Sequence, residues 1–92
     1  MIASFASKGL RDLFETGRLA KIDQRFHKRI LVRLDALNAA VAPADMNIPG
    51  FDFHPLGGAR AGVYSVHVNG PWCVTFGWDC ANAVDVDFEQ YH

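Results

Sequence analysis

The sequence predicts an α+β fold, in which two N-terminal helices pack on a mainly antiparallel sheet. Two observations predict it. Apolar residues recur at helical spacing only as far as Ala40, and beyond it short runs of β-branched and aromatic residues alternate with glycine, asparagine and proline. The 92 residues, 50% of them hydrophobic, suffice for one core of two layers, and no linker divides them. We therefore expect a single domain over residues 1–92.

The first helix is expected in the segment KGLRDLFET. Ser7 is a typical N-cap, because its hydroxyl can accept a hydrogen bond from an unpaired N–H of the first turn. Leu10, Leu13 and Phe14 share one face of this helix. Gly17 is expected to end it, because glycine readily adopts the left-handed conformation that follows many last turns.

The second helix is expected to begin at Ala20 or Asp23 and to end at Ala39 or Ala40. Its apolar face consists of Ile22, Phe26, Ile30, Leu34 and Leu37. Another face is basic and consists of Lys21, Arg25, Lys28, Arg29 and Arg33. Such a stripe is the common solvated surface of a helix, and it is also a charge pattern that can meet a polyanion. The residues alone leave both interpretations open.

Strand patterns follow a segment in which prolines and a glycine stop helicity, with room for one short turn from Pro43 to Met46. The expected strands are FDFHPL, GVYSVHV, PWCVTFGW and AVDVDF. Asn69-Gly70 favours a two-residue turn, but Pro71 lacks the N–H that would close it, so we expect a longer hairpin loop. In the third strand, alternation predicts that Trp72, Val74, Phe76 and Trp78 face the core, with Cys73 and Thr75 on the opposite face.

The net charge of −1 conceals two halves of opposite sign. Residues 1–33 carry eight Lys or Arg and three Asp or Glu, a balance of +5. Residues 34–92 carry one basic residue, Arg60, and seven acids, a balance of −6. The first part is suited to a polyanion and the second to a basic partner.

Cysteine usage and motif searches mainly exclude classes of protein. Cys73 and Cys80 would lie roughly 20 Å apart along one extended stretch, too far for a disulfide, and free thiols are typical of the reducing cytoplasm, where we expect this chain. The sequence contains no run of eighteen apolar residues, so no membrane association is expected. It also contains no secretory signal pattern. Without a C-x-x-C or H-x-x-x-H pair, a P-loop or a G-x-S-x-G motif, no metal or other cofactor is expected.

Four side chains form a set that can cleave RNA without a metal, namely His54, Arg60, Tyr91 and His92. One imidazole can remove the 2′-OH proton and another group can protonate the leaving 5′-oxygen, while a guanidinium holds the phosphate. A tyrosine ring can stack on an exposed base. Composition does not establish that these residues meet in space. For the other two histidines, we expect His27 on the surface and favour a structural role for His67 in its strand.

The order of several segments resembles the HigB toxins of the RelE/ParE superfamily. These segments are SFASKGLRDLFETG, RLDALNAA, HPLGGARAGVYSVHVNGPWCVTF and the final QYH, and together they cover essentially the whole chain. The resemblance implies a compact α+β domain and a ribosome-dependent endoribonuclease that cleaves mRNA in the decoding site. It also implies a HigA-type helix-turn-helix antitoxin as partner, with operator DNA contacted only through that antitoxin.

The resemblance also assigns residues. His54 matches the histidine of the H-x-L-x-G segment, Arg60 the arginine that follows it, and Tyr91 and His92 the terminal pair of the catalytic cleft. Three positions depart from the usual family pattern: Cys73 replaces an arginine, Gly57 a lysine and Gln90 an aspartate. A positioned cation is worth roughly 3–4 kcal/mol to a transition state that gains charge, so we expect a weakened or inactive ribonuclease.

Two further expectations depend on this family. The basic stripe of the second helix is expected to contact ribosomal RNA, and the acidic second half is expected to receive a basic antitoxin segment.

The missing cations also favour an alternative function, a binding module without catalysis. Such a protein would inhibit gyrase, as ParE-type relatives do, or would act only as the corepressor of the antitoxin.

Overall fold

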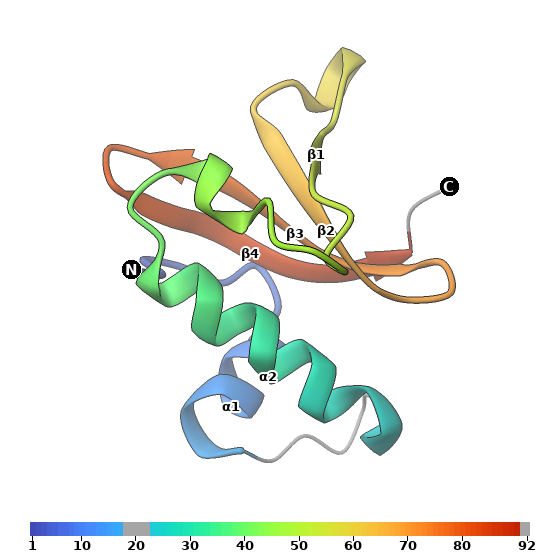
Figure 1. Ribbon diagram of the computed structural model, residues 1–92. Helices are drawn as coiled ribbons and strands as arrows, with labels where there is room; N and C mark the ends of the chain where they lie inside the picture. The colour runs from blue at the N-terminus through green and yellow to red at the C-terminus, as the bar shows by residue number, and fades with distance from the viewer. Residues whose placement is uncertain (18–22, 91–92) are drawn as a thin grey trace.

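The structure, a computed structural model, describes residues 1–17 and 23–90. Two helices are followed by a four-stranded antiparallel sheet, which confirms the predicted α+β fold (Figure 1). The strands lie in the order β1-β2-β3-β4, each paired with the next along the chain. The elements in chain order are α1 (Lys8–Thr16), α2 (Gln24–Ala39), η1 (Pro43–Met46), β1 (His54–Pro55), η2 (Gly58–Arg60), β2 (Val63–Asn69), β3 (Trp72–Asp79) and β4 (Asn82–Gln90).

Side-chain caps mark the start of both helices, and the predicted cap and stop of α1 are both present. The Ser7 hydroxyl accepts a hydrogen bond from the N–H of Leu10, and Gly17 ends α1 in the left-handed conformation, with φ at 75°. Asp23 is the N-cap of α2 and accepts from the N–H of Arg25. The later of the two predicted starts of this helix is therefore confirmed.

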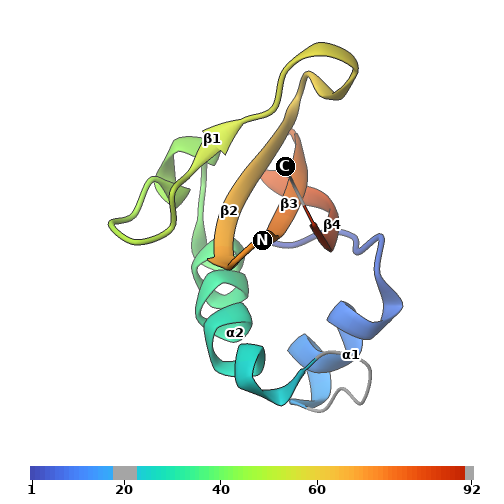
Figure 2. The same ribbon diagram turned by 90° about the vertical axis from the view of Figure 1, so that its right-hand side faces the viewer.

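The core lies between the helices and one face of the sheet, with both helices on the same side of it (Figure 2). The N-terminal segment runs parallel to β4, with bridges from Ile2 to Ala83 and from Phe5 to Val86. This segment covers the outer edge of β4, which would otherwise present unpaired backbone groups. The fully buried side chains of the core include Leu10, Leu13, Ile30, Leu34, Leu37, Val66, Val74 and Phe76.

Two strand predictions differ from the structure. The first strand is shorter than expected, because Asp52 adopts a left-handed conformation (φ 48°) that interrupts the extended chain before His54. The expected longer loop between β2 and β3 is wrong, since only Gly70 and Pro71 separate the paired residues Asn69 and Trp72. The central residues of the turn are Gly70 and Pro71, one position later than Asn69-Gly70, so the N–H that closes the turn belongs to Trp72 and not to the proline. Gly70, with φ at 55°, takes the first central position, where a type II′ turn favours glycine.

Both faces of β3 are shielded from solvent. Val74 and Phe76 are fully buried on the core face, as alternation predicts. On the opposite face, Cys73 and Thr75 are only 4% and 1% exposed. A face that no helix covers is therefore closed by other side chains, and these form the candidate site.

Candidate functional site

Polar and titratable side chains occupy the face of the sheet that points away from the hydrophobic core. The strand register arranges them in two rows across the sheet. The first row runs from His54 through Ser65 and Thr75 to Asp87, and the second from His67 through Cys73 to Glu89. Because neighbouring strands lie about 4.8 Å apart, the imidazoles at one side are roughly 10–15 Å from the carboxylates at the other. Small side chains lie between them.

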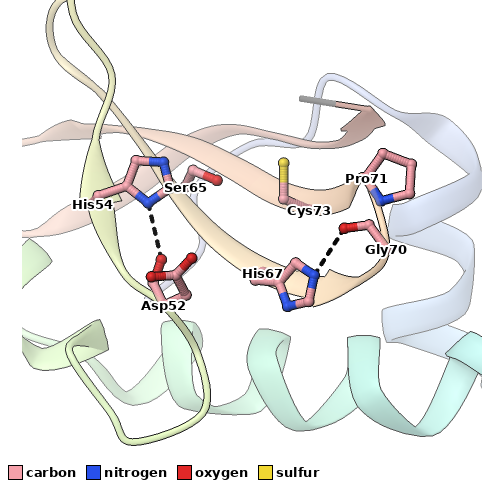
Figure 3. A pocket seen from close by; sticks show the side chains of 7 residues that line it. All are labelled: Asp52, His54, Ser65, His67, Gly70, Pro71 and Cys73. Atoms are coloured by element: carbon pink, nitrogen blue, oxygen red, sulfur yellow. Dashed lines mark hydrogen bonds between the residues drawn. The ribbon is translucent and has the colours of Figure 1, made fainter. Parts of the chain in front are cut away.

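A pocket of about 320 Å³ opens at the histidine side of these rows (Figure 3). His54 comes from β1, His67 from β2 and Cys73 from β3, so the sheet itself positions these three side chains. The volume lies at the lower end of the range found for ligand pockets. The complete lining is Asp52, His54, Ser65, His67, Gly70, Pro71 and Cys73.

Each pocket histidine donates one ring N–H to a backbone carbonyl. Nδ1 of His54 lies 3.0 Å from the Asp52 oxygen, and Nε2 of His67 lies 2.9 Å from the Gly70 oxygen. A carbonyl oxygen can only accept, so each of these nitrogens carries the proton. In the neutral rings, Nε2 of His54 and Nδ1 of His67 are therefore the nitrogens that can accept a proton. This arrangement suits general acid–base chemistry.

The floor of the pocket is uncharged. Ser65 is 1% exposed, and Cys73 is directly opposite His67 in the neighbouring strand. Burial raises the pKa of the Cys73 thiol, and its Sγ donates to the backbone oxygen of Glu89 at 3.5 Å. Cys73 therefore brings neither a positive charge nor a thiolate to the site.

Arg60 is close to this pocket but does not line it. Its guanidinium makes two hydrogen bonds to the carboxylate of Glu89, at 2.6 and 2.9 Å. The Thr75 hydroxyl donates to the same carboxylate at 2.5 Å. The predicted phosphate-holding cation is thus engaged by an internal anion, and a substrate phosphate would have to compete with Glu89 for it.

The Arg60–Glu89 pair has an expected pH dependence. Arg60 holds the pKa of the Glu89 carboxyl below its ordinary value, against an opposing effect of burial. A group with a lowered folded pKa stabilises the protein fully above its unfolded pKa and loses that contribution as the pH falls through the folded value. We expect the free energy of unfolding to fall more steeply below about pH 4.5 in the wild type than in Glu89→Gln, by about 1 kcal/mol or less for a partly exposed pair.

Urea denaturation from about pH 3 to pH 7 measures this difference. Glu15→Gln is the matched control, because Glu15 pairs with Arg11 only at 3.8 Å on the exposed surface of α1. Parallel stability curves for the wild type and Glu89→Gln would show that the ion pair does not contribute.

The remaining predicted site positions divide into described and undescribed residues. Gly57 is exposed, has no atom within 4 Å of the place where a Cβ would stand and has no positive φ, so a side chain fits there without strain. Gln90 ends β4 and pairs with Trp72, next to the pocket residues Pro71 and Cys73. Tyr91, His92 and Lys21 lie outside the described residues.

The predicted basic stripe on α2 is only partly exposed. Arg25, Lys28 and Arg29 are exposed, although Arg25 pairs with Asp23 at 2.7 Å and Arg29 donates to the Val68 oxygen at 3.2 Å. Arg33 is 8% exposed, which corrects its placement on this surface.

The guanidinium of Arg33 is used inside the protein. It donates to the backbone oxygens of His67 at 2.6 Å, Arg29 at 3.0 Å and Gly50 at 3.4 Å. It also lies 4.5 Å from the centre of the Phe51 ring. Arg33 therefore joins α2 to the backbone of β2 and to the loop before β1.

Within residues 1–17 and 23–90, no three His, Cys, Asp or Glu side chains gather in a way that could hold a metal ion. None of the helices in these same ranges has the length and apolar character needed to cross a membrane.

Sequence reasoning missed the position of His67. A structural role was favoured for it, and its Nε2 bond to the Gly70 oxygen does hold the β2–β3 turn, yet the ring also lines the pocket. Strand alternation puts His67 on the same face as Ser65, but the register is needed to show which residue of β1 lies opposite Ser65. That residue is His54.

Comparison with known proteins agrees with this architecture. Residues 3–92 match the model of the HigB-like toxin family, described as the RelE-like toxin of the type II toxin-antitoxin system HigB. A relative from Proteus vulgaris, described as Endoribonuclease HigB, is 36% identical over 92 residues, which cover the whole of both chains. The chain therefore belongs to the HigB-like family of RelE-like toxins, and the antitoxin of a type II system is its partner.

Proposed function

We propose that this toxin is a ribosome-dependent endoribonuclease that cleaves mRNA by attack of the 2′-OH, without a metal ion. The observation that carries the proposal is the pocket in which two imidazoles, from neighbouring strands, each have one nitrogen fixed as a donor to a backbone carbonyl. The relative described as an endoribonuclease supports the reaction type.

In the proposed reaction, Nε2 of His54 takes the proton of the 2′-OH, and the resulting oxygen attacks the adjacent phosphorus. The bond to the 5′-oxygen breaks, that oxygen takes a proton from a second group acting as general acid, and the products are a 2′,3′-cyclic phosphate and a 5′-OH. Arg60 stabilises the charge on the phosphate once its hydrogen bonds to Glu89 are replaced by hydrogen bonds to the substrate phosphate. Tyr91 stacks on a base, and His92 brings a further imidazole to the cleft. Gln90, to which these two residues are joined, pairs with Trp72 beside the pocket.

The proposed partners follow from the same assignment. The antitoxin is of the HigA type, with a helix-turn-helix domain through which alone the complex contacts operator DNA. The substrate is mRNA on the ribosome, so we place the toxin in the cytoplasm.

We further propose that the nuclease is weakened. Arg60 is already paired with Glu89. Asp52 adds negative charge to the pocket lining, and Asp87 adds it at the far end of the row that begins at His54. Cys73 supplies a neutral thiol where the family resemblance expects an arginine, and Gly57 supplies no side chain where it expects a lysine. Gln90 stands where an aspartate is expected. Phosphate binding therefore depends on few cations.

The function is tested with purified toxin, translating ribosomes and a defined mRNA. We expect cleavage at the decoding site, fragments with 2′,3′-cyclic phosphate ends, and no cleavage of the same mRNA without ribosomes. A single 2′-deoxy nucleotide on the 5′ side of the cut should block the reaction, because it removes the nucleophile. Cleavage that survives this substitution would exclude the 2′-OH mechanism.

The occupied guanidinium of Arg60 favours a second candidate, a binding protein that does not cut. Such a protein would inhibit gyrase or act only as the corepressor of the antitoxin. Intact mRNA in the ribosome assay together with blocked DNA supercoiling by gyrase would support this reading.

Contact of α2 with ribosomal RNA yields a prediction. Changing Arg25, Lys28 and Arg29 to glutamine should weaken ribosome binding and lower the slope of log K against log salt by roughly 2–3, if each residue contacts one phosphate. Binding measured by sedimentation at several salt concentrations gives the slope. The control variant changes Lys8 and Arg11 on α1, which are also exposed. Unchanged slope in the α2 variant would remove the helix from the interface.

A further inference from the structure

We propose that His67 is a further catalytic residue of this toxin, the general acid that protonates the leaving 5′-oxygen. The inference rests on the proposed nuclease function and deepens it. It assigns a chemical role to a side chain whose strand position alone favoured a structural one.

The two imidazoles stand on the same face of adjacent strands. His54 pairs with Ser65 across the β1–β2 ladder, and His67 follows Ser65 by two residues, which makes it a diagonal neighbour of His54. Diagonal pairs in an antiparallel ladder have a Cα separation of about 7–8 Å. Both side chains line the same pocket, with His67 at the Gly70–Pro71 turn (Figure 3).

This spacing fits an in-line displacement at phosphorus. The attacking 2′-oxygen and the leaving 5′-oxygen lie on opposite sides of the phosphorus, so the proton acceptor and the proton donor must flank the phosphate and cannot share one side. Ser65 and Cys73, both buried and without charge, line the same pocket of about 320 Å³ as the two rings, and this volume can hold a phosphate. A pair of imidazoles around an open centre meets this requirement.

The hydrogen bonding of His67 is compatible with the protonated ring. Its Nε2 donates to the Gly70 oxygen at 2.9 Å, and a carbonyl oxygen remains a suitable acceptor when the imidazole is charged. Nδ1 then carries the second proton, and no partner for Nδ1 lies within the described ranges. Arg33 holds the backbone of the strand at this point through the His67 carbonyl oxygen at 2.6 Å.

The proton balance of the step is complete. Nε2 of His54 gains the proton of the 2′-OH as the new bond from oxygen to phosphorus forms. The bond from phosphorus to the 5′-oxygen breaks, its electron pair stays on the oxygen, and the Nδ1–H of His67 supplies the proton there. Solvent returns both rings to their starting states after the products leave.

The test uses His67→Gln and a modified mRNA. The glutamine amide nitrogen can replace Nε2 as the donor to the Gly70 oxygen, so the turn keeps its hydrogen bond, but the side chain cannot transfer a proton. The modified mRNA carries sulfur in place of the 5′-oxygen at the cut site. A thiolate leaves without being protonated, so this linkage needs no general acid.

With full-length toxin and translating ribosomes, we expect His67→Gln to cut the normal linkage about 10²–10⁴-fold more slowly than the wild type. On the sulfur linkage, the cleavage rate of His67→Gln should be within about tenfold of the wild-type rate. His54→Asn lacks the base, so its cleavage rate should stay low on both linkages. His92→Gln is measured in parallel, with thermal unfolding of each variant.

Three outcomes would overturn the assignment. Cleavage of the normal linkage by His67→Gln at the wild-type rate would remove His67 from catalysis. An equal loss on both linkages would show that His67 only holds the turn. Recovery by His92→Gln alone would place the general acid at residue 92. If the wild type cuts neither mRNA, the nuclease proposal fails, and the inference falls with it.

Discussion

Replacing His54 with asparagine should lower the rate of mRNA cleavage by about 10²–10⁴-fold, the usual contribution of one positioned proton-transfer group. The asparagine amide can still donate to the Asp52 oxygen, as Nδ1 of His54 does at 3.0 Å, so the strand conformation at the pocket should be kept. What is lost is Nε2, the nitrogen that takes the 2′-OH proton. Single-turnover cleavage on translating ribosomes measures the chemical step directly.

The matched control is His27→Asn. His27 is on α2 and does not line the pocket, so this variant should cut mRNA at the wild-type rate. Ribosome binding by His54→Asn should also be unchanged, because the substitution alters neither Arg60 nor α2. Wild-type cleavage by His54→Asn would show that the pocket is not the catalytic site.

Restoring the arginine expected from the family at position 73 should raise activity by about 10²–10³-fold, the effect of one positioned donor on a transition state that gains charge. Cys73 lines the pocket directly opposite His67 and next to Glu89 in the neighbouring strand. A guanidinium there can reach the phosphate in the pocket, and it can also bind Glu89 and so release Arg60. Both effects act in the same direction.

The measurement is growth arrest on expression of Cys73→Arg, supported by cleavage rates on purified ribosomes. Cys80→Arg adds the same charge at an exposed residue outside the pocket and should leave both unchanged. Thermal unfolding checks that the larger side chain is tolerated at a position only 4% exposed. Unchanged growth arrest by a folded Cys73→Arg protein would contradict the idea of a weakened toxin.

Local chemistry predicted much of this fold. The Ser7 cap and the Gly17 stop depend on a few neighbouring atoms, and the structure contains both, whereas the sequence left the start of α2 open between Ala20 and Asp23. The hairpin loop was harder, because Asn69-Gly70 and Gly70-Pro71 are competing turn centres in the same four residues. The proline that excludes the first is compatible with the second.

The site was less accessible to sequence reasoning, because its residues meet only through strand pairing. The resemblance singled out His54 and Cys73, but the register was needed to place His67 and Glu89 beside them. Helical spacing put Arg33 on a basic stripe. Spacing does not reveal that its guanidinium donates hydrogen bonds to backbone oxygens of β2 and of the loop before β1. Long-range hydrogen bonds of this kind leave no periodic pattern in the sequence.

Arg33 also bears on how genetic data for this toxin should be interpreted. In a selection for cells that survive expression, substitutions at this codon are expected among the suppressors, although the side chain is buried and its guanidinium is bound to backbone oxygens inside the protein. Such substitutions would reduce toxicity by distorting the pocket. If suppressor positions on α2 were all taken as RNA contacts, Arg33 would be counted among them wrongly.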